Sequence, residues 1–177
     1  MLKLNAQQLR TTSVDPEKAK KLPKNPIYII LDNVLDTYNI GSVFRLADAV
    51  AAEELIITGQ SEIPPNTRIK KASINTTEWV KWQYAPTAVE AIAKLKVKSP
   101  KLKVVAIEQN PKSVLYTEMK WEFPVALVVG NETYGVSEEV LKEADAIVEL
   151  PMFGVNVSLN VMVSLGIVLY KAIEKLP

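Results

Sequence analysis

The sequence predicts an α/β fold with a mostly parallel sheet that is covered by helices on both faces. Short and almost wholly apolar runs recur along the chain, and such runs are typical of strands buried on both sides. Segments with helical periodicity lie between them, so strands and helices alternate. With 177 residues and 48% hydrophobic residues, the chain is long enough to form one domain with a sizeable core.

The first half of the chain supplies three strands and two helices. Strands are expected at 27–31, 55–58 and 79–84, and helices at 40–50 and 88–95. The first two strands are apolar throughout, whereas the third alternates apolar and polar residues as a half-exposed strand does. In the first helix, apolar residues recur on one face, at Ile40, Val43, Phe44, Ala47 and Val50.

The second half supplies three further strands and two helices. Strands are expected at 102–107, 125–129 and 146–150, and helices after Ser137 and at 159–173. Ser137 precedes two glutamates, and a serine cap followed by negative charge suits a helix N-terminus. The last helix is apolar on nearly every face. This is more apolar surface than one small domain can bury. Part of it is therefore expected to form a homodimer interface.

The glycines are clustered in three stretches, 31–48, 128–137 and 150–164. These stretches hold four of the six glycines, namely Gly41, Gly130, Gly135 and Gly154. Glycine permits positive φ and close backbone approach, so the clustering suggests loops shaped around a ligand. Two of the stretches follow late strands, and ligands of parallel sheets bind at the carboxyl ends of strands. The alternative for the third stretch is a plain cap on the helix that follows.

Absent residue types narrow the chemistry. The chain has no cysteine and no histidine, which excludes disulfides, thiol nucleophiles, Ser-His-Asp triads and histidine-ligated metals. A reaction must therefore use Arg, Lys, Asp, Glu, Ser, Asn or Tyr. Neither G-x-G-x-x-G after the first strand nor G-x-x-x-x-G-K-[ST] is present, which argues against a dinucleotide-dependent dehydrogenase and a P-loop NTPase.

Charge and hydropathy predict a soluble cytoplasmic protein. The net charge is +1, so no global basic field exists. The first ten residues lack the apolar core of a signal peptide. The apolar C-terminal segment falls short of the roughly 20 unbroken apolar residues of a membrane span. It is interrupted by Asn156, Ser158, Asn160 and Ser164.

Taken together, the three glycine-containing stretches resemble the ordered motifs of the SpoU (TrmH-like) family of RNA ribose 2′-O-methyltransferases, in the SPOUT superfamily. They read Asn39-x-Gly41-Ser42-x-x-Arg45-x-Ala47-Asp48, then Gly130-Asn131-Glu132-x-x-Gly135-Val136, then Pro151-Met152-x-Gly154 with Ser158-Leu159-Asn160-Val161. Each motif alone is modest, but three in this order and spacing form a strong signal. The resemblance spans residues 27–170.

The resemblance implies a deep C-terminal trefoil knot that binds S-adenosylmethionine, and a homodimer that completes the active site. The implied reaction is methylation of a ribose 2′-hydroxyl in structured RNA, with tRNA favoured over rRNA. No metal is needed, because the methyl group is already activated and positioning supplies much of the acceleration. The implied cofactor-binding residues are Glu108, Val129, Gly130, Asn131, Leu150, Met152, Gly154, Ser158 and Leu159.

The implied catalytic residues are Asn39, Arg45, Glu132, Ser158 and Asn160. Arg45 would act on the 2′-hydroxyl, or would clamp a neighbouring phosphate with its planar fork, since a free guanidinium is rarely a base. Plainer alternatives stay open. Arg45 can be a surface arginine, Glu132 a turn acid, and the others helix caps. Glu108 can equally have a structural role.

RNA binding would depend on local basic patches, of which Arg68, Lys70 and Lys71 form the main one. A second cluster comprises Lys18, Lys20, Lys21 and Lys24. Lysine runs are also common on plain solvated surfaces. The chain is expected to be a single domain over 1–177, with 1–24 an extension too short for a separate RNA-binding domain. A non-catalytic RNA-binding or assembly module that retains the fold is the alternative function.

Overall fold

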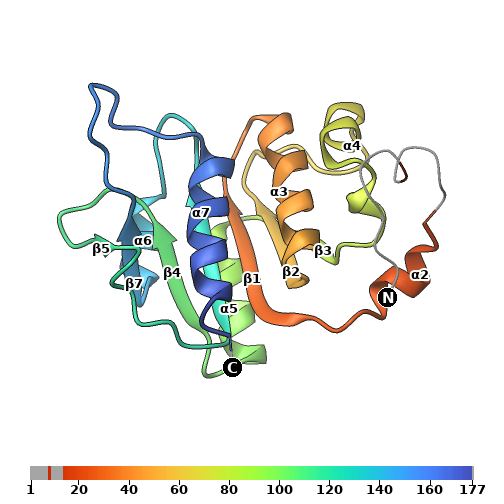
Figure 1. Cartoon of the computed structure of the whole chain (residues 1–177), viewed down its shortest axis with the longest axis horizontal. Helices are drawn as coiled ribbons and strands as arrows, with labels where there is room; N and C mark the ends of the chain where they lie inside the picture. Colours follow the sequence, from red (N-terminus) through yellow and green to blue (C-terminus); the bar gives the residue numbers. More distant parts are fainter. Residues whose placement is uncertain (1–7, 9–13, 177) are drawn as a thin grey trace.

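The protein is built on one all-parallel sheet (Figure 1). The computed structural model describes residue 8 and residues 14–176. Within this part, seven strands run in the order β3-β2-β1-β6-β4-β7-β5, and every neighbouring pair is parallel. They are β1 (Asn25–Asp32), β2 (Ala52–Thr58), β3 (Trp82–Ala85), β4 (Lys103–Ile107), β5 (Val114–Leu115), β6 (Val125–Gly130) and β7 (Ala146–Glu149). The predicted parallel sheet is confirmed.

Helices cover both faces of this sheet, as predicted. In the described residues they are α2 (Pro16–Lys20), α3 (Thr37–Ala49), α4 (Thr67–Ser73), α5 (Ala88–Lys98), α6 (Glu138–Glu143) and α7 (Val161–Ile173), with a 3-10 turn at Thr76–Glu78. Helices α3 and α7 pack side by side on one face, and α5 and α6 lie on the other (Figure 1). The deep knot stays a prediction.

The alternation of side chains along β1 explains why its residues 27–31 are all apolar. Ile27, Ile29 and Leu31 join the core beneath α3 and α7, whereas Tyr28 and Ile30 join the core beneath α5 and α6. Successive strand residues point to opposite faces, so a strand covered on both sides needs an apolar residue at every position.

The N-terminal extension is described only in part, because residues 1–7 and 9–13 lie outside the described residues. Ala19, on α2, is buried in the core beneath α3 and α7, and Val14 packs against the same core. No helix in residues 14–176 has both the length and the apolar character that crossing a bilayer requires.

Several predicted element boundaries were wrong. The strand expected at 79–84 begins only at Trp82, because the backbone N–H groups of Trp79 and Val80 both donate to Thr76 O and extend the 3-10 turn. Helix α3 is capped by Asp36, three residues before Asn39. Ser137 does precede α6, but its side chain makes no capping hydrogen bond. Its backbone N–H instead donates to Asp32 Oδ2 (2.8 Å). Helices α2 and α4, strand β5 and the 3-10 turn were not predicted.

Sheet order decides which parts of the sequence meet. Strand β1 lies directly beside β6, with Asp32 paired in register with Gly130. Because all strands are parallel, their carboxyl ends share one edge, which is the upper edge in Figure 1. The segments after β1, β6 and β7 carry the three sequence motifs, and all three therefore start from this edge.

Candidate active site

A pocket of about 470 Å³ opens at the carboxyl ends of β4, β6 and β7. All the residues predicted to bind the cofactor line it, except Gly154. These are Glu108, Val129, Gly130, Asn131, Leu150, Met152, Ser158 and Leu159. Glu132 and Asn160, predicted to be catalytic, line it as well. The fold thus brings residues from distant motifs to one cavity, while their individual roles stay predictions.

A chain of hydrogen bonds joins the three motifs beside this pocket. The Glu132 carboxylate accepts hydrogen bonds from the backbone N–H groups of Leu35 and Asp36 and from Asn39 Nδ2, each at 3.0 Å. Asn39 Oδ1 in turn accepts from Asn160 Nδ2 at 2.9 Å. The side-chain oxygen of Asn160, Oδ1, accepts hydrogen bonds from the first free N–H groups of α7 and so caps that helix. Asn39 is therefore a buried link inside α3 and not its cap.

These bonds set the protonation state of Glu132. Partial burial alone would raise its pKa, but the hydrogen bonds from Asn39, Leu35 and Asp36 outweigh burial, and the net pKa is lowered. A carboxylate with a lowered pKa that already accepts three donors is a poor general base. Through these hydrogen bonds, Glu132 holds the start of α3 against the loop after β6.

The lowered pKa makes site stability depend on pH. The ionised Glu132 contribution is fully present above the pKa of an unfolded glutamate, and it is lost as the pH falls through the lower folded pKa. We expect Glu132→Gln to be less stable than wild type at neutral pH, with the difference in unfolding free energy shrinking in acid. Urea unfolding across the acidic range measures this. Glu62→Gln, at an exposed loop position, is the control. A difference that is the same at every pH would contradict it.

The loop after β6 is held in one tight conformation. A Cβ on Gly130 would collide with the backbone of Gly135, so only glycine fits there. The N–H and C=O groups of Asn131 and Gly135 pair with each other (3.0 and 2.9 Å). Glu108 Oε2 accepts from the Val136 N–H (2.8 Å), which ties the end of β4 to this loop. Glu108 therefore has the structural role left open above, besides lining the pocket.

The segment between β7 and α7 extends away from the sheet, at the upper left of Figure 1. Gly154 lies in its exposed part, outside the pocket lining, and a Cβ there would meet no atom within 4 Å. Gln109 Nε2 donates to Val157 O (2.6 Å) and connects the segment to the end of β4. Ser158 Oγ donates to Asn156 Oδ1 (2.9 Å), so Ser158 does not cap α7.

Sequence reasoning missed Gln109, which lines the pocket and holds this segment. Its position directly after Glu108, at the end of a predicted strand, was an available signal. Glu149, another lining residue that was not predicted, accepts a hydrogen bond from Ser113 Oγ (2.7 Å). Within residues 14–176, no cluster of three or more acidic side chains that could hold a metal ion is found.

Arg45 stands apart from the pocket of its own chain. It is exposed on α3, and it does not line the pocket. Among the described residues, its side chain makes no hydrogen bond or ion pair. The fold thus brings Asn39, Glu132, Ser158 and Asn160 to the pocket region but leaves Arg45 outside it.

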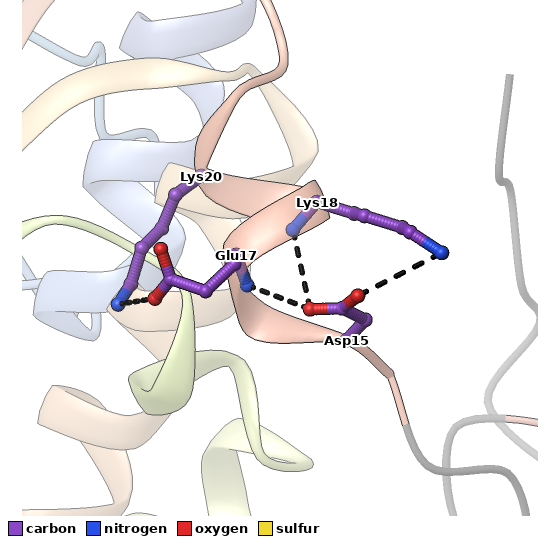
Figure 2. A network of polar contacts seen from close by, with 4 residues as sticks. All are labelled: Asp15, Glu17, Lys18 and Lys20. Carbon is purple, nitrogen blue, oxygen red and sulfur yellow. Dashed lines mark hydrogen bonds and ion pairs between the residues drawn. The ribbon is translucent and has the colours of Figure 1, made fainter.

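Acidic residues neutralise part of each basic patch. On α4, Arg68 and Lys71 are exposed and have no ion-pair partner among the described residues, while Lys70 lies 3.4 Å from Glu78. In the N-terminal cluster, Lys18 pairs with Asp15 (3.7 Å) and Lys20 with Glu17 (2.7 Å), as Figure 2 shows. Lys21 and Lys24 also lack an ion pair in the described part of the chain, so each patch keeps two unpaired cations and ion pairing does not choose between them.

Comparisons with known proteins agree with the motifs. The model of the SpoU rRNA Methylase family matches residues 26–170. A tRNA (guanosine(18)-2′-O)-methyltransferase of Aquifex aeolicus is 34% identical over 150 residues, covering 82% of this chain and 68% of that protein. The YacO protein of Bacillus subtilis is 29% identical over 157 residues. The match covers 89% of this chain and 62% of YacO, so the chain spans less than two thirds of that relative.

Among solved structures, an AdoMet-bound rRNA methyltransferase of Sinorhizobium meliloti superposes with a TM-score of 0.79 and 28% identity. The superposition covers 90% of this chain and 60% of that one. The family match extends over most of the described residues and includes all three motifs that meet at the pocket. The chain therefore belongs to the SpoU rRNA Methylase family.

Proposed function

We propose that the protein transfers the methyl group of S-adenosylmethionine to a ribose 2′-hydroxyl of RNA. The observation that carries this proposal is the convergence of residues from all three family motifs on one pocket and its hydrogen-bond chain. The Aquifex aeolicus relative is named for this reaction, and the Sinorhizobium meliloti structure contains the cofactor. We propose tRNA before rRNA as the substrate class.

The pocket suits the cofactor chemically. Apolar side chains, among them Val129, Leu150 and Leu159, offer a surface for the adenine ring, and Glu108 and Glu149 place negative charge in a site meant for a cation. The close packing of Gly130 against the backbone of Gly135 keeps the loop after β6 tightly folded. When bound, the cofactor supplies an already activated methyl group, and the protein's task is to orient the acceptor hydroxyl.

Few groups are available to handle the acceptor hydroxyl. Histidine and cysteine are absent, and Glu132 is engaged by three donors. Arg45 is therefore proposed to hold the acceptor, either at the 2′-hydroxyl or at an adjoining phosphate through its bidentate fork. Asn39 and Asn160 are proposed to position α3 and α7, the helices on either side of their shared hydrogen bond.

Binding of the cofactor product and methyl transfer together test this function. Calorimetry with S-adenosylhomocysteine is expected to show one site per chain, with no comparable heat for NAD or ATP. Labelled methyl groups from S-adenosylmethionine should then appear in bulk cellular RNA, at ribose and not at base positions. RNA binding without either result would favour the alternative, a non-catalytic RNA-binding or assembly module.

We also propose that two copies form the active enzyme. Helix α7 and the residue before its cap expose an apolar stripe at Leu159, Val163, Ile167 and Tyr170, at helical spacing. A second copy with the same stripe is a suitable cover, and the separation of Arg45 from its own pocket suits an active site completed by the partner.

Light scattering tests the dimer. Wild-type protein is expected to have the mass of two chains at micromolar concentration, and Ile167→Lys to have the mass of one, because a charge placed in an apolar interface is costly. Val97→Lys, at an exposed position of α5, is the matched control and should stay dimeric. A monomeric wild type would refute both the interface and a shared active site.

The remaining sequence-based predictions stand as parts of this proposal. They are a single domain over 1–177, a C-terminal trefoil knot around the cofactor, and action in the cytoplasm, where tRNA and rRNA are modified. The role of Arg68, Lys70 and Lys71 in RNA binding is likewise proposed. Phosphate contacts of this kind make affinity fall as salt rises.

A further inference from the structure

Tyr134 is an aromatic residue held out into solvent beside the pocket. Its side chain is 86% exposed. The loop that carries it is fixed by the paired backbone bonds of Asn131 and Gly135, and Asn131 Oδ1 accepts hydrogen bonds from the N–H groups of Thr133 (2.9 Å) and Tyr134 (3.1 Å). Thr133 and Glu132, the residues directly before it, line the pocket.

A single exposed apolar residue is ordinary on a protein surface. Tyr134 differs because its backbone is rigid and because the same loop forms the pocket wall. Among the described residues, its hydroxyl makes no hydrogen bond, so nothing in the chain fixes the ring. Because the loop backbone is already fixed, only the two side-chain torsions of Tyr134 lose freedom when a flat partner stacks on the ring.

Cations on α3 and on α4 that are unpaired within the described residues are available to contact the phosphates of a nucleotide partner. Arg45 lies on α3, which Asn39 ties to the loop through Glu132, and its guanidinium has no partner among the described residues. On α4, packed against α3, the side chains of Arg68 and Lys71 are also exposed and lack an ion pair in the described part of the chain. Cations that contact phosphates, together with an aromatic ring that stacks on a base, are the common means of binding single-stranded nucleic acid.

From this arrangement we propose that Tyr134 stacks on an unpaired base next to the ribose that is methylated. The inference rests on the proposed function and names its substrate class: RNA whose bases are free to leave a helix, such as a loop, and not a continuous duplex. Bases inside a duplex present no open face, so Tyr134 contributes nothing to duplex binding. Tyr134 is a specificity-determining residue that touches substrate and takes no part in the chemical step.

The test compares Tyr134→Ala, Tyr134→Phe and wild type, all as the full chain with S-adenosylhomocysteine present. Fluorescence anisotropy measures binding to oligo(A) and to the same strand annealed to oligo(U). For Tyr134→Ala, the Kd for the single strand is expected to rise about tenfold, while the Kd for the duplex changes less than about twofold. Tyr134→Phe keeps the ring and should bind like wild type. Tyr84→Ala, on β3 at the edge of the sheet, is the matched control.

Several results would overturn the inference. They are an unchanged single-strand Kd in Tyr134→Ala, an equal loss on both probes, a halved mass in light scattering, or lost binding of S-adenosylhomocysteine. The last two would place Tyr134 in a subunit interface or the cofactor site. The binding measurements do not depend on turnover, so absent methyl transfer would count against the proposed function alone. Where turnover is measured, Tyr134→Ala should raise KM for RNA and leave kcat within about twofold of wild type.

Discussion

Replacing Arg45 with alanine is expected to lower methyl-transfer turnover by about a hundredfold or more, the scale of losing one positioned charge in the transition state. Folding and binding of S-adenosylhomocysteine should be nearly unchanged, because Arg45 is exposed and does not line the pocket of its own chain. Arg45→Lys should also be slow, since an ammonium cannot reproduce a bidentate fork. Transfer of labelled methyl groups at saturating RNA measures all three proteins.

Arg68→Ala provides the matched control, because Arg68 is also an exposed arginine without an ion pair among the described residues, on the helix packed against α3. Its loss should weaken RNA binding and leave turnover at saturating RNA close to wild type. Wild-type turnover in Arg45→Ala would remove Arg45 from the mechanism. The acceptor hydroxyl would then lose its proton to water or to the RNA itself.

Gly130→Ala is expected to abolish cofactor binding and to lower the thermal midpoint, because the new Cβ would collide with the backbone of Gly135. The loop would have to open, which breaks the paired Asn131–Gly135 bonds and moves the wall of the pocket. Displacements of packed backbone of this kind cost about 1–3 kcal/mol or more. Calorimetry with S-adenosylhomocysteine and a thermal melt give the two readouts.

Gly154→Ala is the same chemical change at the other motif glycine, where a Cβ would meet nothing within 4 Å. It should fold like wild type and lose far less cofactor affinity. If the two variants bound the cofactor equally well, the tight packing at Gly130 would have no part in shaping the pocket.

Much of the fold could be predicted because strands that are buried on both faces need apolar residues at successive positions. Residues 27–31 of β1 and all of β6 are apolar, and their short length and many β-branched residues favour buried strands over buried helix segments. The start of α3 was misplaced because Asp36 and Asn39 are both good capping residues and spacing alone does not choose between them. Strand β5 has only two residues, too few to show a period.

The candidate site was predictable as a set of residues but not as a geometry. Gly130 and Gly154 look alike in sequence, yet one is packed against backbone and the other is open. That difference depends on Gly135, which approaches Gly130 only after the loop folds back on itself. Likewise, sequence could not show that Asn39 connects Glu132 to Asn160, since those partners lie 93 and 121 residues away.

The separation of 121 residues between Asn39 and Asn160 also matters for how the protein is synthesised. A ribosome releases the chain from its N-terminus, so α3 and its Asn39 emerge long before Asn160 exists. The hydrogen bond that links α3 to α7 cannot form in any nascent chain that ends before residue 160. Contacts this remote in sequence also form slowly. A nascent chain that ends before residue 160 should therefore lack methyl transfer, even where its α4 cations already contact RNA.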